Sequence, residues 1–274
     1  GIKEMQIGSF VNPRAIPQFS DMDEIVQNVS TLPDISLSTL VPNISGAQKA
    51  ASRGIRKIIF FFSISKSHNL CNVRQTPQES IKELRQITRT YGGDPDISLQ
   101  VALATAFGCP FEGDIKTAAV LRAVDNVAAC GIKEITLCDT VGLGNPAMIE
   151  KKFSACRQRF PEIMFGAHFH NTRGLALANT LRAYDIGIRH FEAATGGLGG
   201  CPYAPQSSGN AATEEIVFMF QEMGIITGID LTKLCGVCRF LKKILPRTNI
   251  GGLLLRAGLP KKHKFNFHKQ EKIK

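Results

Sequence analysis

Apolar residues gather along the chain in two alternating patterns. Short runs rich in β-branched and aromatic residues predict buried strands, and the longer stretches between them place apolar residues at helical spacing. Strands are expected at residues 4–10, 35–41, 56–63, 97–104, 134–139, 163–170 and 188–194. Helices are expected at residues 44–53, 76–91, 115–130, 146–159, 174–187, 213–223 and 231–246. Such an alternation is typical of βα units around a parallel sheet.

The boundaries of the pattern support one continuous domain. Thr76-Pro77 and Asn145-Pro146 each place a capping residue before a proline, as helix starts do. No low-complexity linker or change of composition divides the chain. We therefore expect one domain over residues 1–260 and a basic, disordered tail over residues 261–274.

Seven βα units are one fewer than a closed barrel requires. An open doubly wound sheet also accepts seven strands, but it needs a glycine-rich phosphate turn after its first strand, and "GSFVNPRAIPQ" does not supply one. The chain also begins without an initiator Met, already close to its first strand pattern. The expected fold is therefore α/β, a (β/α)8 TIM barrel that is incomplete at the N-terminus because its first βα unit is missing.

Composition and charge narrow the classes of partner. The 274 residues are 43% hydrophobic and include no apolar run long enough to span a membrane, so no membrane partner is expected. Much of the net charge of +10 lies in the tail "KKHKFNFHKQEKIK", which indicates a solvated tail rather than a nucleic-acid-binding arm. A basic body favours anionic substrates such as carboxylates or coenzyme A phosphates.

The eight cysteines show no spacing typical of a disulfide framework, which suits free thiols in a reducing compartment. Cys235 and Cys238 form a C-x-x-C pair, but the surrounding residues have the pattern of a single helix. We therefore expect neither a redox role nor a zinc site for this pair.

Polar residues of a kind used in catalysis follow three successive strands. His168 and His170 lie two residues apart near a strand end, so both side chains leave the same face. Spacing alone does not separate a ligand pair from two ordinary histidines. However, Asp139 ends the preceding strand, and a glycine-rich loop with Cys201 and Asn210 follows the next one. In a barrel, chemistry gathers at these carboxyl-terminal ends, so these positions together predict one site.

Five stretches together resemble the 3-hydroxy-3-methylglutaryl-coenzyme A lyase family of metal-dependent barrel lyases. They are "GSFVNPRAIPQ", "GCPFEG", "LCDTVGLGNP", "HFHNTRGLALANTLRA" and "FEAATGGLGGCPYAPQSSGNAATEEIVFM". The resemblance extends to about Pro260. Its specific element is the Gly-Gly-Cys-Pro-Tyr-Ala loop, since the His-x-His pair also occurs in isopropylmalate and homocitrate synthases and in 4-hydroxy-2-oxoacid aldolases.

The resemblance implies a metal-dependent carbon–carbon lyase. It assigns His168, His170 and Asn210 as ligands of a divalent cation, Mg²⁺ or Mn²⁺, a donor set that suits such an ion. Cys201 and Asp139, together with His168, are the expected catalytic residues. The implied reaction is a retro-Claisen cleavage of 3-hydroxy-3-methylglutaryl-CoA, or a similar thioester, to acetyl-CoA and acetoacetate.

The resemblance also places substrate contacts at Gln6, Lys66 and Thr136. Gln6 and Lys66 each stand where the family usually has Glu, and the Asp-Arg-x-Gly-Leu-Gln type of motif of the family's first strand is not in the sequence. That motif supplies a metal-ligating Asp and an Arg that stabilises the enolate. Gln100 and Ala102 replace larger groups, which indicates an altered acyl pocket.

Two alternatives remain open from sequence: a related acyl-CoA lyase or aldolase with a different substrate, and a catalytically silent barrel fragment. For the leading interpretation we expect an acyl-CoA substrate, no nucleic-acid partner, and a homodimer or higher homo-oligomer. The expected location is the cytoplasm, or the mitochondrial matrix if a transit peptide precedes the chain.

Overall fold

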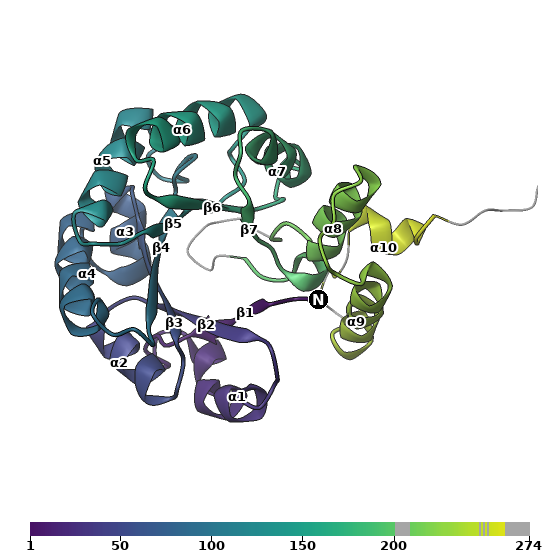
Figure 1. Ribbon diagram of the computed structural model, residues 1–274, viewed down its shortest axis with the longest axis horizontal. Helices are drawn as coiled ribbons and strands as arrows, with labels where there is room; N and C mark the ends of the chain where they lie inside the picture. Colours follow the sequence, from purple (N-terminus) through teal and green to yellow (C-terminus); the bar gives the residue numbers. More distant parts are fainter. Residues whose placement is uncertain (201–208, 247, 249, 251, 261–274) are drawn as a thin grey trace, which may run out of the picture.

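A computed structural model describes residues 1–200, 209–246, 248, 250 and 252–260. Seven strands form one sheet in chain order, and every neighbouring pair is parallel. The strands are β1 (Glu4–Ser9), β2 (Ser36–Val41), β3 (Lys57–Ser63), β4 (Ser98–Ala104), β5 (Glu134–Asp139), β6 (Met164–Phe169) and β7 (His190–Glu192). All seven were expected from the sequence. They curve into an open arc, as Figure 1 shows.

Helices cover the outer, convex side of this arc (Figure 1). All seven expected helices are present, as α2 (Ile44–Ser52), α4 (Pro77–Tyr91), α5 (Thr117–Ala128), α6 (Pro146–Arg159), α7 (Ala176–Asp185), α8 (Thr213–Glu222) and α9 (Leu231–Ile244). The structure adds α1 (Met22–Val29), α3 (Lys66–Val73) and α10 (Leu253–Ala257), with short 3-10 turns at Pro17–Phe19 and Thr195–Gly197.

The architecture is that of an incomplete (β/α)8 barrel, as the sequence pattern predicted. Each strand pairs only with its neighbours in the chain, and no eighth strand joins β1 to β7 within the residues that the structure describes. Helices α8, α9 and α10 pack on one another near the end of the arc, close to the N-terminus (Figure 1). The predicted division into residues 1–260 and a tail stays a prediction, because residues 261–274 lie outside the described part.

The main hydrophobic core lies between the sheet and the outer helices. Its largest fully buried side chains are Phe60, Phe62, Phe107, Phe153 and Phe169. Burying an aromatic side chain of this size contributes about 1.5–3 kcal/mol. Because successive side chains of a strand alternate between its faces, this outward packing directs the other residues of each strand toward the inside of the arc.

Local capping sets where the helices begin. Thr76 and Glu79 form a reciprocal capping box at the start of α4, and the Asn145 side chain accepts a hydrogen bond from the Met148 N–H at the start of α6. Helix α4 therefore begins at Pro77 and helix α6 at Pro146. In the described part of the chain, no helix has the length and apolar character needed to cross a membrane.

Candidate active site

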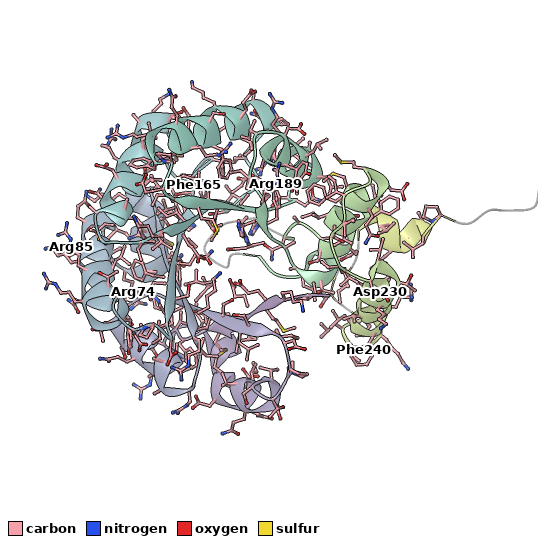
Figure 2. The ribbon with its side chains drawn as sticks, in the orientation of Figure 1. Arg74, Arg85, Phe165, Arg189, Asp230 and Phe240 are labelled. Carbon is pink, nitrogen blue, oxygen red and sulfur yellow. The ribbon has the colours of Figure 1, made fainter. Side chains whose placement is uncertain are left out.

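The inside of the arc contains a cavity of about 680 Å³. Strand β6 shows how its wall is made, because Phe165 and Phe169 pack into the core while Gly166 and His168 line the cavity. Figure 2 shows Phe165 on the helix side of β6. Polar residues from five strands and one loop are among those that line the cavity: Gln6, Gln100, Thr136, His168, Glu192 and Asn210.

His168 and His170 lie side by side at the carboxyl end of β6, with ring centroids 5.2 Å apart. The His168 side chain is 25% exposed, whereas His170 is buried. Burial, with a smaller contribution from the neighbouring His168, lowers the pKa of His170 to about 3. His170 is therefore neutral at physiological pH, which is the state in which imidazole binds metals.

Asn210 faces His170 across an isolated antiparallel bridge. The Asn210 amide nitrogen donates a hydrogen bond of 2.6 Å to the Leu198 carbonyl, which fixes the orientation of the amide. The amide oxygen Oδ1 is buried, and no hydrogen-bond partner for it exists among the described residues. Leaving a buried oxygen without a hydrogen bond costs about 1–3 kcal/mol of stability unless a bound ligand interacts with it.

Glu192 connects His168 to two other strands. Glu192 Oε2 lies 3.3 Å from His168 Nδ1, while Oε1 accepts hydrogen bonds from Gln100 and Thr136. Burial has the largest influence on the pKa of Glu192 and raises it, but the contact with His168 and the two hydrogen bonds together lower it below its usual value. Glu192 is thus an ionised acceptor within the site.

Asp139 ends β5, as expected, but its carboxylate is bound to the loop that follows. Its two oxygens accept hydrogen bonds from the N–H groups of Leu143 at 2.9 Å and Gly144 at 3.0 Å. Asp139 is fully buried, and burial raises its pKa although the two N–H groups partly offset that effect. It does not line the cavity, so its contact with substrate stays a prediction.

The remaining predicted site residues differ in their placement. Gln6 and Thr136 both line the cavity, and the Thr136 hydroxyl is engaged by Gln100 and Glu192. Lys66 is exposed at the first position of α3 and is not among the residues that line the cavity. Cys201 lies outside the described residues.

No group of three or more His, Cys, Asp or Glu residues is arranged to hold a metal ion within the described part of the chain. What the site offers is two imidazoles and the partnerless amide oxygen of Asn210. These are the three residues that the sequence singled out as ligands. They meet because β6 and the segment after residue 208 run next to each other.

Sequence reasoning missed Glu192 altogether and assigned Gln100 only to an acyl pocket. Both were detectable in principle, because each is a polar residue inside a short, otherwise mainly apolar strand pattern. Only the register of β4 to β7 shows that they share one hydrogen-bond network.

Comparisons with known proteins show the family of this chain. The model of the HMGL-like family matches residues 1–241. The hydroxymethylglutaryl-CoA lyase YngG of Bacillus subtilis is 38% identical over 254 residues, covering 91% of this chain and 85% of the relative. The (R)-citramalyl-CoA lyase of Chloroflexus aurantiacus is 35% identical over 268 residues, covering 94% and 84%.

Solved structures give the same result. An HMG-CoA lyase from Acinetobacter baumannii, in complex with coenzyme A and 3-methylmalate, superposes with a TM-score of 0.91 at 38% identity. The match covers 97% of this chain and 87% of that protein. The HMG-CoA lyase structure from Bacillus subtilis superposes with a TM-score of 0.88, at 36% identity and with 94% and 86% coverage.

Proposed function

The chain belongs to the HMGL-like family and is a carbon–carbon lyase of the hydroxymethylglutaryl-CoA lyase type, and we propose that it cleaves 3-hydroxy-3-methylglutaryl-CoA to acetyl-CoA and acetoacetate with the help of a divalent cation. The observation that carries this proposal is the buried, partnerless Oδ1 of Asn210 beside the histidine pair. A buried amide oxygen without a hydrogen bond is suited to bind a cation.

His168, His170 and Asn210 would hold the cation. His170 is kept neutral by burial, and Asn210 is oriented by its hydrogen bond to Leu198. Imidazole nitrogens and an amide oxygen suit Mg²⁺ or Mn²⁺ when substrate and water complete the coordination. Such an ion supplies a positive charge that aligns the substrate hydroxyl and stabilises negative charge on its oxygen.

The reaction itself requires two proton transfers. A base removes the proton of the tertiary hydroxyl, the adjacent carbon–carbon bond breaks, and its electron pair forms the enolate of acetyl-CoA while the hydroxyl carbon becomes a ketone. An acid then protonates the enolate carbon. Cys201 and Asp139 stay the predicted acid and base for these transfers.

A second substrate has support from one specific similarity. The (R)-citramalyl-CoA lyase matches this chain nearly as well as the hydroxymethylglutaryl-CoA lyases do. Both thioesters carry a tertiary hydroxyl and release acetyl-CoA, so the same site suits either one. The second product separates them, because citramalyl-CoA yields pyruvate and 3-hydroxy-3-methylglutaryl-CoA yields acetoacetate.

The test is a product assay on the purified protein. The protein is incubated with each thioester in the presence of Mn²⁺ or of EDTA, and acetyl-CoA, acetoacetate and pyruvate are quantified. We expect Mn²⁺-dependent acetoacetate formation that His168→Ala abolishes. Formation of pyruvate alone would identify citramalyl-CoA as the substrate instead. Activity that EDTA leaves unchanged would exclude a role for the cation. No activity toward either thioester would overturn the proposal.

A further inference from the structure

A hydrogen-bond network crosses four strands and ends at His168. Gln100 on β4 donates from its side-chain nitrogen to Thr136 Oγ1 at 2.7 Å and to Glu192 Oε1 at 2.9 Å. Thr136 on β5 donates its hydroxyl proton to the same Oε1 at 2.9 Å. The other oxygen of Glu192, on β7, lies 3.3 Å from His168 Nδ1 on β6.

The network passes through a gap left by Gly166. Gly166 pairs with Thr136 across β5 and β6, and a Cβ atom at position 166 would lie 2.8 Å from Thr136 Oγ1. Real Cβ atoms do not approach a neighbouring atom that closely, so any side chain here would displace the hydroxyl. The absence of a side chain at Gly166 therefore lets Thr136 reach past β6 to Glu192.

Counting donors and acceptors fixes where the protons lie. The Thr136 hydroxyl receives one hydrogen bond from Gln100 and gives its single proton to Glu192. An ionised carboxylate only accepts, so the imidazole nitrogen that faces Glu192 Oε2 must carry hydrogen. A neutral imidazole has only one N–H, and Nε2 of His168 is then left with a lone pair.

We propose that Glu192 is a positioning residue that, held by Gln100 and Thr136, keeps His168 in the Nδ1–H tautomer and so presents the lone pair of Nε2 to the divalent cation. The inference rests on the proposed function only for the identity of what Nε2 binds. The tautomer itself follows from the network and is measurable without any metal.

Replacing Glu192 by Gln inverts this arrangement. Gln100 and Thr136 both donate to the position of Oε1, so the new amide oxygen takes that position. The amide nitrogen then faces His168 Nδ1 and donates to it. His168 must accept at Nδ1, its proton moves to Nε2, and the atom that should bind the cation no longer has a free lone pair.

The experiment compares wild type with Glu192→Gln and a matched control, Glu134→Gln. Glu134 of β5 also lines the cavity, but its carboxylate pairs with Lys57 at 3.1 Å, so the control removes the same charge without changing the Glu192–His168 contact. The tautomer of His168 is read by long-range ¹H–¹⁵N correlation of metal-free, ¹⁵N-labelled protein at about pH 8, where free imidazole is neutral. The signal is assigned by its loss in His168→Ala. Mn²⁺ affinity is measured by calorimetric titration.

We expect the Nδ1–H tautomer in wild type and in Glu134→Gln, and the Nε2–H tautomer in Glu192→Gln. Mn²⁺ affinity should fall about 10–100-fold in Glu192→Gln alone, the usual effect of removing a residue that orients a metal-binding histidine. Thr136→Val provides a second test if Glu192→Gln does not fold, with an expected loss of about tenfold that Thr136→Ser avoids.

The outcomes separate the two proposals. An Nε2–H tautomer in wild type, or one that Glu192→Gln leaves unchanged, overturns the role of Glu192 whatever the activity. If the tautomer changes as expected but neither wild type nor any variant binds Mn²⁺, the cation site and with it the proposed function are overturned. The effect of Glu192 on the tautomer then still holds. A change of tautomer that is accompanied by loss of Mn²⁺ affinity supports both.

Discussion

His68 and His168 lie in two regions that resemble each other in local chemistry and differ in access. In the first region, His68 of α3 has its Nδ1 2.7 Å from the Ser63 hydroxyl, and the ring is fully buried. In the second, His168 of β6 has its Nδ1 3.3 Å from Glu192, and its side chain is 25% exposed at the cavity. In each histidine, Nδ1 thus contacts a polar side chain.

The difference lies in what the other ring nitrogen meets. His68 Nε2 is buried, and no hydrogen-bond partner for it is found in the described part of the chain. Burial lowers the pKa of His68, which keeps the ring neutral in a closed environment. A polar ring without access to solvent contributes to packing, whereas the same ring at a cavity can bind a ligand. Access to the cavity therefore distinguishes His168 from His68, and the role of His168 as a ligand stays a prediction.

The largest effect should come from the cavity region. His168→Ala is expected to reduce kcat/KM for thioester cleavage by about 10³-fold, or about 4 kcal/mol, because it removes a ligand of the charge that stabilises the transition state. Unfolding by urea should change little, since the side chain is partly exposed. A steady-state assay with acetyl-CoA detection measures the loss, and near-normal activity would remove His168 from the site.

The opposite result is expected for the closed region. His68→Ala should lower the free energy of unfolding by about 2–3 kcal/mol, because it leaves a void and an unpaired Ser63 hydroxyl in the interior. Activity of the folded fraction should stay within about threefold of wild type. Urea denaturation measures the stability change, and an activity loss comparable to that of His168→Ala would contradict the comparison.

The pH dependence of stability provides a third distinction. The pKa of His68 is lowered in the folded protein, so below about pH 6.5 the unfolded chain binds a proton that the folded protein does not. The contribution of neutral His68 to the free energy of unfolding is therefore present above that pH and is lost as the pH falls. His68→Ala should reduce the slope of unfolding free energy against pH by up to about 1.4 kcal/mol per unit. The slopes of wild type and His68→Ala are compared by urea denaturation between about pH 5 and about pH 7. Identical slopes would show that the pKa of His68 does not change on unfolding.

The smallest effect concerns the partner of His68. Ser63→Ala should cost about 1 kcal/mol, because it leaves His68 Nδ1 buried without its hydrogen bond. Ser98→Ala is the matched control, since Ser98 is exposed at the start of β4 and should change stability by less than about 0.5 kcal/mol. Thermal unfolding compares the two variants. Equal melting temperatures would mean that the Ser63 hydroxyl contributes nothing.

Most of the fold was predictable because the apolar pattern is strong. Each expected strand and helix is present, with small differences at the ends. The pattern did not predict α1, α3 and α10, and α3 shows the reason. Its sequence "KSHNLCNV" contains few strong helix formers and no clear apolar stripe, so the helix depends on the Ser65 cap and on its contacts with β3.

The sequence predicted which site residues lie together where they are close along the chain. It did not do so where only the pairing of strands brings distant residues together. His168 and His170 share a strand face by spacing alone, and Asn210 was grouped with them because its loop follows the next strand. By contrast, Glu192 is 92 residues from Gln100 along the chain, and only the parallel pairing of β4 to β7 brings their side chains together. A polar residue in an apolar strand signals such a network without identifying its members.

The missing side chain at Gly166 also determines what a protein engineer would have to transplant. Side chains alone do not carry the site, since the proton on His168 depends on contacts that cross an empty position in β6. The smallest graft is a single segment from Ser98 to Asn210, contiguous in the gene, with residue 166 kept as glycine. A host barrel that kept alanine at that position would receive the histidines without the tautomer that makes one of them useful.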